Sequence, residues 1–363
     1  MSAHEILIYI MAAFAVLGAL DRIFGNRIGI GKEFEEGIQA MGSLALAMLG
    51  IIALAPVLAS LLRPVVVPVY RFLGADPAMF AGTILACDMG GAPLASQLSA
   101  DPEAAALGGI LNGSMLGATI VFTIPVAIGI LRKEDTGALA KGILAGIVTI
   151  PIGILAGGLV AGIPVIKVLR NLVPVALMAA IIALGLWKAE VWMVKGFAVF
   201  GKGIIALITV GLGAAIVESL TGLVLIPGMA PLSDGFETVG AIAIVLAGAF
   251  PLVWAVTRLL RKPLLKVGKW MGINETAAGG LIATLANSIA TFGMVKDMDD
   301  RGKVVNIAFA VSAAFVFGDH LGFTAGYAPQ WLPAMIVGKL VGGISAVLIA
   351  LLLTKKPKTA GST

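Results

Sequence analysis

The sequence is poor in the residues that soluble enzymes rely on. Only 12% of its 363 residues are charged, whereas soluble domains carry about 25%. It has one cysteine, Cys87, so an intrachain disulfide is excluded, and two histidines, His4 and His320, which cannot form an HExxH zinc site. It also lacks a GxxxxGK[ST] phosphate loop and a GxSxG nucleophile elbow. We therefore expect no enzyme, no catalytic residue, no metal site and no cofactor.

Long apolar runs dominate instead, with 59% hydrophobic residues and a mean hydropathy of +1.05. Runs of about 20 apolar residues match the thickness of a bilayer, whereas a transmembrane barrel would alternate apolar and polar residues over about 10. Eleven stretches stand out: 6–20, 40–62, 77–98, 104–131, 138–163, 168–187, 196–222, 238–260, 274–295, 304–325 and 331–354. The sequence therefore predicts an all-α, polytopic integral membrane protein with one transmembrane transporter domain, 1–363.

Two of these stretches are weak helices with polar residues at their centres. "TILACDMGGAP" (83–93) carries Asp88, and "ATLANSIATFG" (283–293) carries Asn287. Each follows a Gly-x-Asp/Asn, in "GADPAM" (74–79) and "GINETA" (272–277), and each has a Leu-Leu-Arg further upstream. These matches indicate an internal repeat of about 34–131 against 236–325, although chance similarity between apolar segments is the alternative.

The distribution of Lys and Arg tests this organisation. If all eleven stretches span the membrane, the two sides carry similar numbers of basic residues. If 77–98 and 274–295 are re-entrant hairpins, the cytoplasmic side carries twenty and the outer side only four, namely Arg63, Arg71, Lys167 and Arg170. The positive-inside rule favours the second arrangement. We therefore predict about nine spanning helices plus two hairpins, an inverted repeat, the N-terminus outside, the C-terminus inside and a short cytoplasmic tail, 355–363. A net charge of +5 held mainly in loops reports this orientation, and we expect no nucleic-acid partner.

Ionisable residues inside apolar stretches are the candidates for function, because placing one at the centre of a membrane helix costs about 2.5–3.5 kcal/mol on insertion scales. Asp88 lies in the expected break of the first hairpin, where it either contacts a cation or caps a half-helix. Asn287 lies at the equivalent depth of the second hairpin, where its amide either binds a hydroxyl group or bonds to the broken backbone. Asp319 and His320 form a ligand site, a proton relay or the polar outer end of their span.

The remaining polar residues have weaker claims. Asn112 and Asn306 are possible polar partners inside spans. Asn274 and Glu275 are secondary candidates that equally fit a helix start, and Glu218 is a secondary candidate that equally fits snorkelling to water.

Four long strings give the chain a family likeness. "EFEEGIQAMGSLALAM" (33–48), "ALAPVLASLLRPVVVPVYRFLGADPAMF" (53–80), "CDMGG" (87–91) and "FAVSAAFVFGDHLGFTAG" (309–326) closely resemble the ethanolamine utilization permease family (EutH). This resemblance implies a protein of the bacterial inner membrane that takes up ethanolamine, which enzymes inside the cell then degrade. Composition and spacing alone indicate only a membrane transporter with buried acids and, as its partner, the lipid bilayer.

The resemblance suggests how a site would work. By analogy with lysine, the amine of ethanolamine is mostly cationic at neutral pH, and an unpaired ammonium group is costly to bury. We expect Asp88 to pair with the ammonium group, Asn287 or Asn112 to bond the hydroxyl group, and Asp319 and His320 to complete or gate the far side. A carrier for another small amine or a nucleoside-like solute, and a membrane enzyme acting on amino-alcohol headgroups, are the alternatives. A homo-oligomer is possible, and energy coupling stays open.

Overall fold

The computed structural model describes residues 1–354, without the side chains of Leu260, Arg261 and Leu264, so the expected tail at 355–363 lies outside the described residues. Within 1–354 every regular element is helical, as predicted. The first half comprises α1 (Ala3–Ile23), α2 (Ile30–Phe72), α3 (Ala78–Ile84), η1 (Cys87–Met89), α4 (Gly91–Leu98), α5 (Pro102–Ala106), η2 (Leu107–Gly117), η3 (Thr119–Thr123), α6 (Ile124–Ile130), η4 (Lys133–Asp135), α7 (Thr136–Ile147) and α8 (Ile150–Val160). The second comprises α9 (Val165–Thr221), α10 (Leu232–Met271), α11 (Glu275–Ala286), α12 (Ser288–Met294), η5 (Val295–Asp297), α13 (Asp300–Ala313), α14 (Asp319–Tyr327), η6 (Pro329–Trp331) and α15 (Leu332–Leu353).

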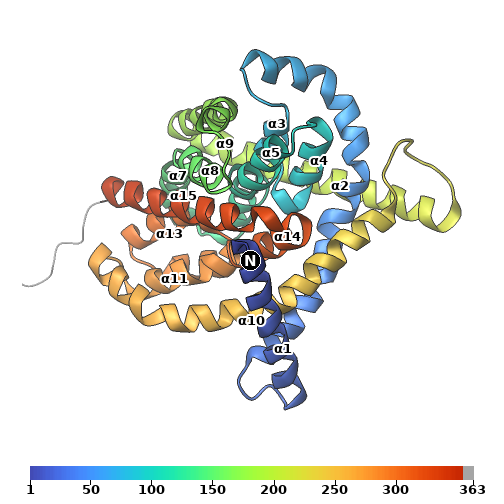
Figure 1. Ribbon diagram of the computed structural model, residues 1–363. Coiled ribbons are helices and arrows are strands. Elements are labelled where there is room, and N and C mark those ends of the chain that lie inside the picture. Colours follow the sequence, from blue (N-terminus) through green and yellow to red (C-terminus); the bar gives the residue numbers. More distant parts are fainter. Residues whose placement is uncertain (355–363) are drawn as a thin grey trace, which may run out of the picture.

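Two long helices, α2 and α10, form one side of the molecule and pack against each other (Figure 1). Glycine permits this packing, because a Cβ atom on Gly37 would lie only 2.5 Å from the backbone nitrogen of Ala247. The N-terminal helix α1 lies against the same pair, and its Met11 backs onto Gly248. The remaining helices, α3 to α8 and α11 to α15, gather on the other side and enclose the buried core (Figure 1).

Among residues 1–354, seven helical segments are long and apolar enough to cross a membrane. One of them, α9, has 57 residues and a non-helical kink at Ala189. Its two arms correspond to the separate stretches expected at 168–187 and 196–222. The stretch expected at 304–325 appears as two shorter helices, α13 and α14. The count of nine spans therefore stays a prediction.

Both expected hairpin breaks are confirmed. The first hairpin consists of α3 and α4, and the chain between them leaves the helical conformation at Leu85 and makes a single 3₁₀ turn around Asp88. Gly90 then takes a φ of 95°, a value that glycine adopts without steric cost. The second hairpin consists of α11 and α12, which are separated by Asn287 alone, in an extended conformation.

A third break, between α13 and α14, was not expected from the sequence. Residues 314–318 turn away from the helix, and Phe315 has a φ of 63°, rare for a residue with a bulky side chain. The freed backbone is satisfied by the second hairpin. The N–H of Phe315 donates to the carbonyl oxygen of Thr284 at 3.2 Å, and that of Phe317 donates to Leu285 at 2.9 Å. The second hairpin and the third break therefore form one hydrogen-bonded unit.

Candidate functional site

The breaks bring three predicted residues together around one small buried cavity. Asp88 comes from the 3₁₀ turn of the first hairpin, and Asp319 and His320 form the first turn of α14. The His320 Nε2 atom lies 3.8 Å from a carboxylate oxygen of Asp88, and their side chains are 3% and 15% exposed. Asp319 and His320 therefore lie inside the fold beside Asp88, rather than at the polar outer end of a continuous span.

Aromatic rings form the apolar wall of the same cavity. Phe122 and Phe315 meet edge to face, with their centroids 5.4 Å apart, and the Phe315 ring lies 5.3 Å from the His320 ring. Aromatic faces carry a negative quadrupole that attracts cations. Two carboxyl groups and two phenyl rings therefore give this cavity the composition of a site for a small organic cation.

One polar atom at the site has no partner among the residues that the structure describes. The Nδ1 atom of His320 is buried and makes no hydrogen bond to any residue the structure describes. Because buried polar groups in native proteins are nearly always hydrogen-bonded, this atom is available to a water or a solute that enters the cavity. A neutral imidazole offers one donor and one acceptor, so His320 can bond the hydroxyl or amine of a bound solute.

The cavity has a volume of about 30 Å³. A buried water needs about 10–15 Å³, so the cavity has room for roughly two waters. A solute with four heavy atoms requires the walls to move apart. The structure is therefore a closed form of the site.

Lys339 of α15 is a buried residue near the site to which the sequence analysis gave no role. Its side chain is only 1% exposed, and its Nζ atom donates a hydrogen bond to the backbone carbonyl of Ser114 in η2. The neighbouring residue, Gly113, backs directly onto Cys87, where an added Cβ would lie 3.0 Å from the backbone nitrogen. A lone lysine in an otherwise apolar stretch was the available signal.

The asparagines predicted to bind solute serve the backbone in this structure. Asn112 is fully buried, and its amide nitrogen donates to the carbonyl oxygen of Met79 and to Thr83 in the first hairpin. Asn287 accepts a hydrogen bond from the N–H of Ile289 and so caps α12. Neither side chain lines the cavity. The capping interpretation of Asn287 is the one that the structure favours.

The secondary candidates also lie away from the cavity. Asn274 caps α11 through the N–H of Ala277, as a helix-start residue does. Glu275 is 76% exposed and lies 3.9 Å from Lys269. Glu218 lies near the end of α9 and is outside the cavity lining.

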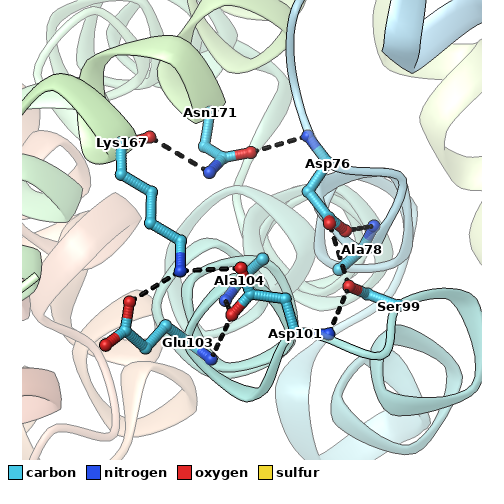
Figure 2. Close-up of polar contacts among 8 residues, drawn as sticks. All are labelled: Asp76, Ala78, Ser99, Asp101, Glu103, Ala104, Lys167 and Asn171. Atoms are coloured by element: carbon cyan, nitrogen blue, oxygen red, sulfur yellow. Dashed lines mark hydrogen bonds and ion pairs between the residues drawn. The ribbon is translucent and has the colours of Figure 1, made fainter.

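A polar cluster holds the open ends of the first hairpin (Figure 2). Asp76, just before α3, accepts a hydrogen bond from Ser99, just after α4, at 2.9 Å. Lys167, at the start of α9, lies 2.6 Å from both Asp101 and Glu103. Burial of Asp101 opposes ionisation, but hydrogen bonds from Lys167 and from backbone N–H groups hold the pKa of this carboxyl below its ordinary value. The cluster therefore fixes the two ends of the hairpin to each other and to α9.

The described residues also include one group that could hold a metal ion. The ligand atoms of Cys87, Asp88 and His320 lie within 4.8 Å of one another. A thiol, a carboxylate and an imidazole are a donor set that suits zinc. These atoms belong to the same site, and the chemistry proposed below uses the carboxylate and imidazole without a metal.

Fold and site together are those of a helical membrane protein with a buried site for a solute or an ion. Apolar helices of membrane-spanning length enclose a buried cavity with two carboxyl groups and a histidine, and such residues in a membrane protein mark a solute or ion site by default. The chain belongs to the family described as ethanolamine utilisation protein EutH, which matches residues 3–353.

Bacterial relatives match the chain from end to end. A protein of Listeria monocytogenes named probable ethanolamine permease EutH is 59% identical over 98% of this chain and 95% of its own length. Proteins with the same name from Escherichia coli and Salmonella typhimurium are 50% and 49% identical, over 98% and 99% of this chain and 97% and 98% of their own lengths. No solved structure matches the chain.

Proposed function

We propose that this protein is a permease of the bacterial inner membrane that admits ethanolamine and does not alter it chemically. The observation that carries the proposal is the buried cavity in which Asp88 and Asp319 face His320 beside two phenyl rings. The names of the relatives support ethanolamine as the solute. Its degradation then falls to enzymes inside the cell.

In this proposal Asp88 pairs with the ammonium group, as the sequence indicated. A charge-assisted hydrogen bond replaces part of the hydration that the cation loses on entry. Phe122 and Phe315 face the cation, and the Nδ1 atom of His320 receives or donates the bond to the hydroxyl group. Asp319 completes the polar side of the cavity. Asn112 contributes indirectly, because it fixes the helix that leads to Asp88.

We further propose that two halves of the chain are inverted repeats, entering the membrane from opposite sides. Matched features support this. The long helices α2 and α10 are each followed by a glycine with positive φ, Gly74 at 71° and Gly272 at 70°, and then by a two-helix hairpin. Asn112 and Asn306 each bond back to a carbonyl in the first helix of their own hairpin, at Met79 and Ala277. Inverted repeats with broken helices are a recurring plan of secondary transporters.

Uptake by purified protein in liposomes tests the function. We expect labelled ethanolamine to enter, to be recovered unchanged, and to be displaced by unlabelled ethanolamine in preference to larger amines. Asp88→Asn should reduce uptake about tenfold to hundredfold, since a hydrogen bond to a charged group is worth about 1.5–3 kcal/mol. Asp234→Asn, at an exposed acid of α10, is the matched control and should leave uptake unchanged. Full uptake by a correctly inserted Asp88→Asn protein would contradict the assignment.

Cysteine labelling tests the topology, because the native Cys87 is buried and gives little background. Leu225→Cys, in the exposed loop between α9 and α10, should react with a membrane-impermeant reagent from outside. Glu134→Cys, at an exposed site before α7, should react only from inside. The opposite pattern would refute the proposed orientation.

A further inference from the structure

Two short helices, α4 and α14, lead from the proposed site to one further polar contact. α4 follows the 3₁₀ turn of Asp88, α14 begins with Asp319 and His320, and the His320 Nε2 atom lies 3.8 Å from the Asp88 carboxylate. About two helical turns later the two helices meet again, where the hydroxyl oxygens of Ser96 and Tyr327 lie 3.4 Å apart. The site and this second contact are therefore joined by α4 on one side and by α14 on the other.

The second contact borders a cavity of about 690 Å³, the outer cavity, which is lined by Ser96, Arg63 and Arg71 among others. These arginines are two of the few basic residues on the predicted outer side of the membrane. Ser96 donates its own hydroxyl hydrogen to the carbonyl oxygen of Ala92, so Tyr327 is the donor in the contact. Its length of 3.4 Å exceeds the range of about 2.5–3.0 Å usual between hydroxyl groups. A weak contact therefore lies between a wall of the outer cavity and the last residue of α14.

One face of α14 runs from this contact to the site. His320, Thr324 and Tyr327 are spaced i, i+4 and i+7, which places their side chains on the same side of a helix. The opposite side of α14 carries Gly322 and Gly326, which lie directly against α10. His320 and Tyr327 both contact the first hairpin. Thr324 lies between them, so it faces the first hairpin as well.

The hydroxyl group of Thr324 is buried and unused. The side chain is fully buried, and its Oγ1 atom makes no hydrogen bond within the described part of the chain. Other buried threonines of this protein, such as Thr83 and Thr119, donate to the carbonyl oxygen four residues earlier in their own helices. Thr324 has the carbonyl oxygen of His320 at that position and does not bond to it. Its hydroxyl group is therefore available to a solute that moves along this face.

We propose that the face formed by His320, Thr324 and Tyr327 is the outer part of the substrate path, with Thr324 as a further binding position and Tyr327 at the entrance. This inference rests on the proposed function. An ethanolammonium ion from the outer cavity first meets the ring of Tyr327, whose bond to Ser96 breaks as the side chain rotates. The ion then bonds to the Thr324 hydroxyl group before it reaches Asp88. Entry through Tyr327 requires rotation of one side chain and no separation of helices.

Uptake of labelled ethanolamine by purified protein in liposomes tests the role of Thr324. Thr324→Val removes the hydroxyl group and keeps the shape of the side chain. KM should rise about twofold to tenfold, the change expected for a hydrogen bond worth about 0.5–1.5 kcal/mol. The melting temperature in detergent should not fall, because the hydroxyl group has no described partner to lose. Thr324→Ser should restore the wild-type KM, and Thr209→Val, at an exposed threonine of α9, is the control and should leave KM unchanged.

Two results with Thr324→Val would overturn the inference. A KM equal to that of the wild type would show that the substrate does not use the hydroxyl group. A fall in melting temperature together with the rise in KM would show that the hydroxyl group supports the fold instead.

Cysteine labelling separates a failure of this path from a failure of the proposed function. A small cationic thiol reagent added from outside should modify Thr324→Cys, and ethanolamine should slow the reaction. Leu321→Cys, at a buried position on another face of α14, is the matched control and should not react. The parent protein gives the background from Cys87. If Thr324→Cys reacted no faster than Leu321→Cys, the path would be overturned while wild-type uptake still supported the permease; no uptake by the wild type would overturn both. Should Thr324→Cys fail to fold, the KM of Thr324→Val decides.

Discussion

The contact between Gly318 and Ala286 offers the sharpest test of how the site is assembled. Gly318 lies directly before Asp319, and a Cβ atom on Gly318 would lie 2.1 Å from the backbone carbonyl oxygen of Ala286, at the end of α11. Real Cβ atoms essentially never approach closer than 3.0 Å, so Gly318→Ala must separate the two segments by about 0.9 Å. The obstacle is backbone, which cannot rotate aside as a side chain would.

The magnitude follows from the same geometry. An overpacked methyl group in a close-packed core costs about 1–3 kcal/mol. Two hydrogen bonds, from Phe315 and Phe317 to α11, resist the separation and would lengthen with it. If the whole cost falls on the assembled site, substrate binding weakens about fivefold to hundredfold, at 1.4 kcal/mol for each factor of ten. His320 moves with Gly318, so its 3.8 Å approach to Asp88 is lost first.

Two assays measure these effects separately. Heating in detergent, followed by gel filtration of the folded fraction, should show Gly318→Ala to be less stable than the parent. Uptake in liposomes should show a raised KM. Gly293→Ala is the matched control, because Gly293 is an exposed position of α12 and a Cβ there meets nothing within 4 Å. The control should gain up to about 1 kcal/mol from helix propensity. If Gly318→Ala matched the parent in both assays, the two breaks would not be coupled as the structure indicates.

Three other changes test the polar interactions that support the fold. Asn306→Leu removes a buried hydrogen bond to the Ala277 carbonyl oxygen and should cost about 1–3 kcal/mol of stability in the detergent melt, partly offset because the Asn306 side-chain oxygen has no described partner to lose. Lys303→Met should lower stability by about 3–5 kcal/mol, because it leaves the carboxylate of Asp135 buried without its partner; Asp135 is 3% exposed and lies 2.6 Å from Lys303. Adding Asp135→Asn should recover much of the lost stability, and no recovery would contradict the pairing. The lowered pKa of Asp101 contributes stability that is present above the unfolded pKa of about 3.9 and is lost as pH falls through the lower folded value. Asp101→Asn should therefore flatten the acid limb of a curve of stability against pH. At pH 7 it should change stability by at most about 1 kcal/mol.

The sequence revealed the two hairpin breaks, because both have local causes. Asp88 is followed by Gly90, Gly91 and Pro93, and Asn287 by Ser288, so polar and helix-breaking residues marked both hairpins. These signals lie within a few residues of the break and are visible without any knowledge of packing. The resemblance to the permease family added the solute, which no local pattern contained.

The third break has no such local cause. Residues 311–317 are "VSAAFVF", a string that continues a helix as readily as it ends one. The helix ends because backbone groups of Phe315 and Phe317 bond to α11, some thirty residues earlier in the chain. Lys339 is visible in the sequence as a lone lysine in an apolar stretch, but its partner, the carbonyl oxygen of Ser114, lies more than two hundred residues away. Interactions between distant segments of the chain decide both features, and a single sequence does not show which segments meet.

The closed cavity must widen before ethanolamine fits, and the packing of the two hairpins indicates where. The first hairpin meets η2 backbone to backbone: a Cβ on Gly82 would lie 1.8 Å from Gly108 O, and one on Gly117 would lie 1.9 Å from Leu85 O. It can move only together with η2. The second hairpin instead borders a cavity of about 670 Å³, which is lined by Ala286 among others and extends to Glu275 and Trp254. Ala286 also contacts Gly318, the residue next to Asp319, so this contact lies between a wall of the larger cavity and a residue of the site. Because the first hairpin is held to η2 and the second borders this open space, we expect the site to open by separation of Ala286 from Gly318.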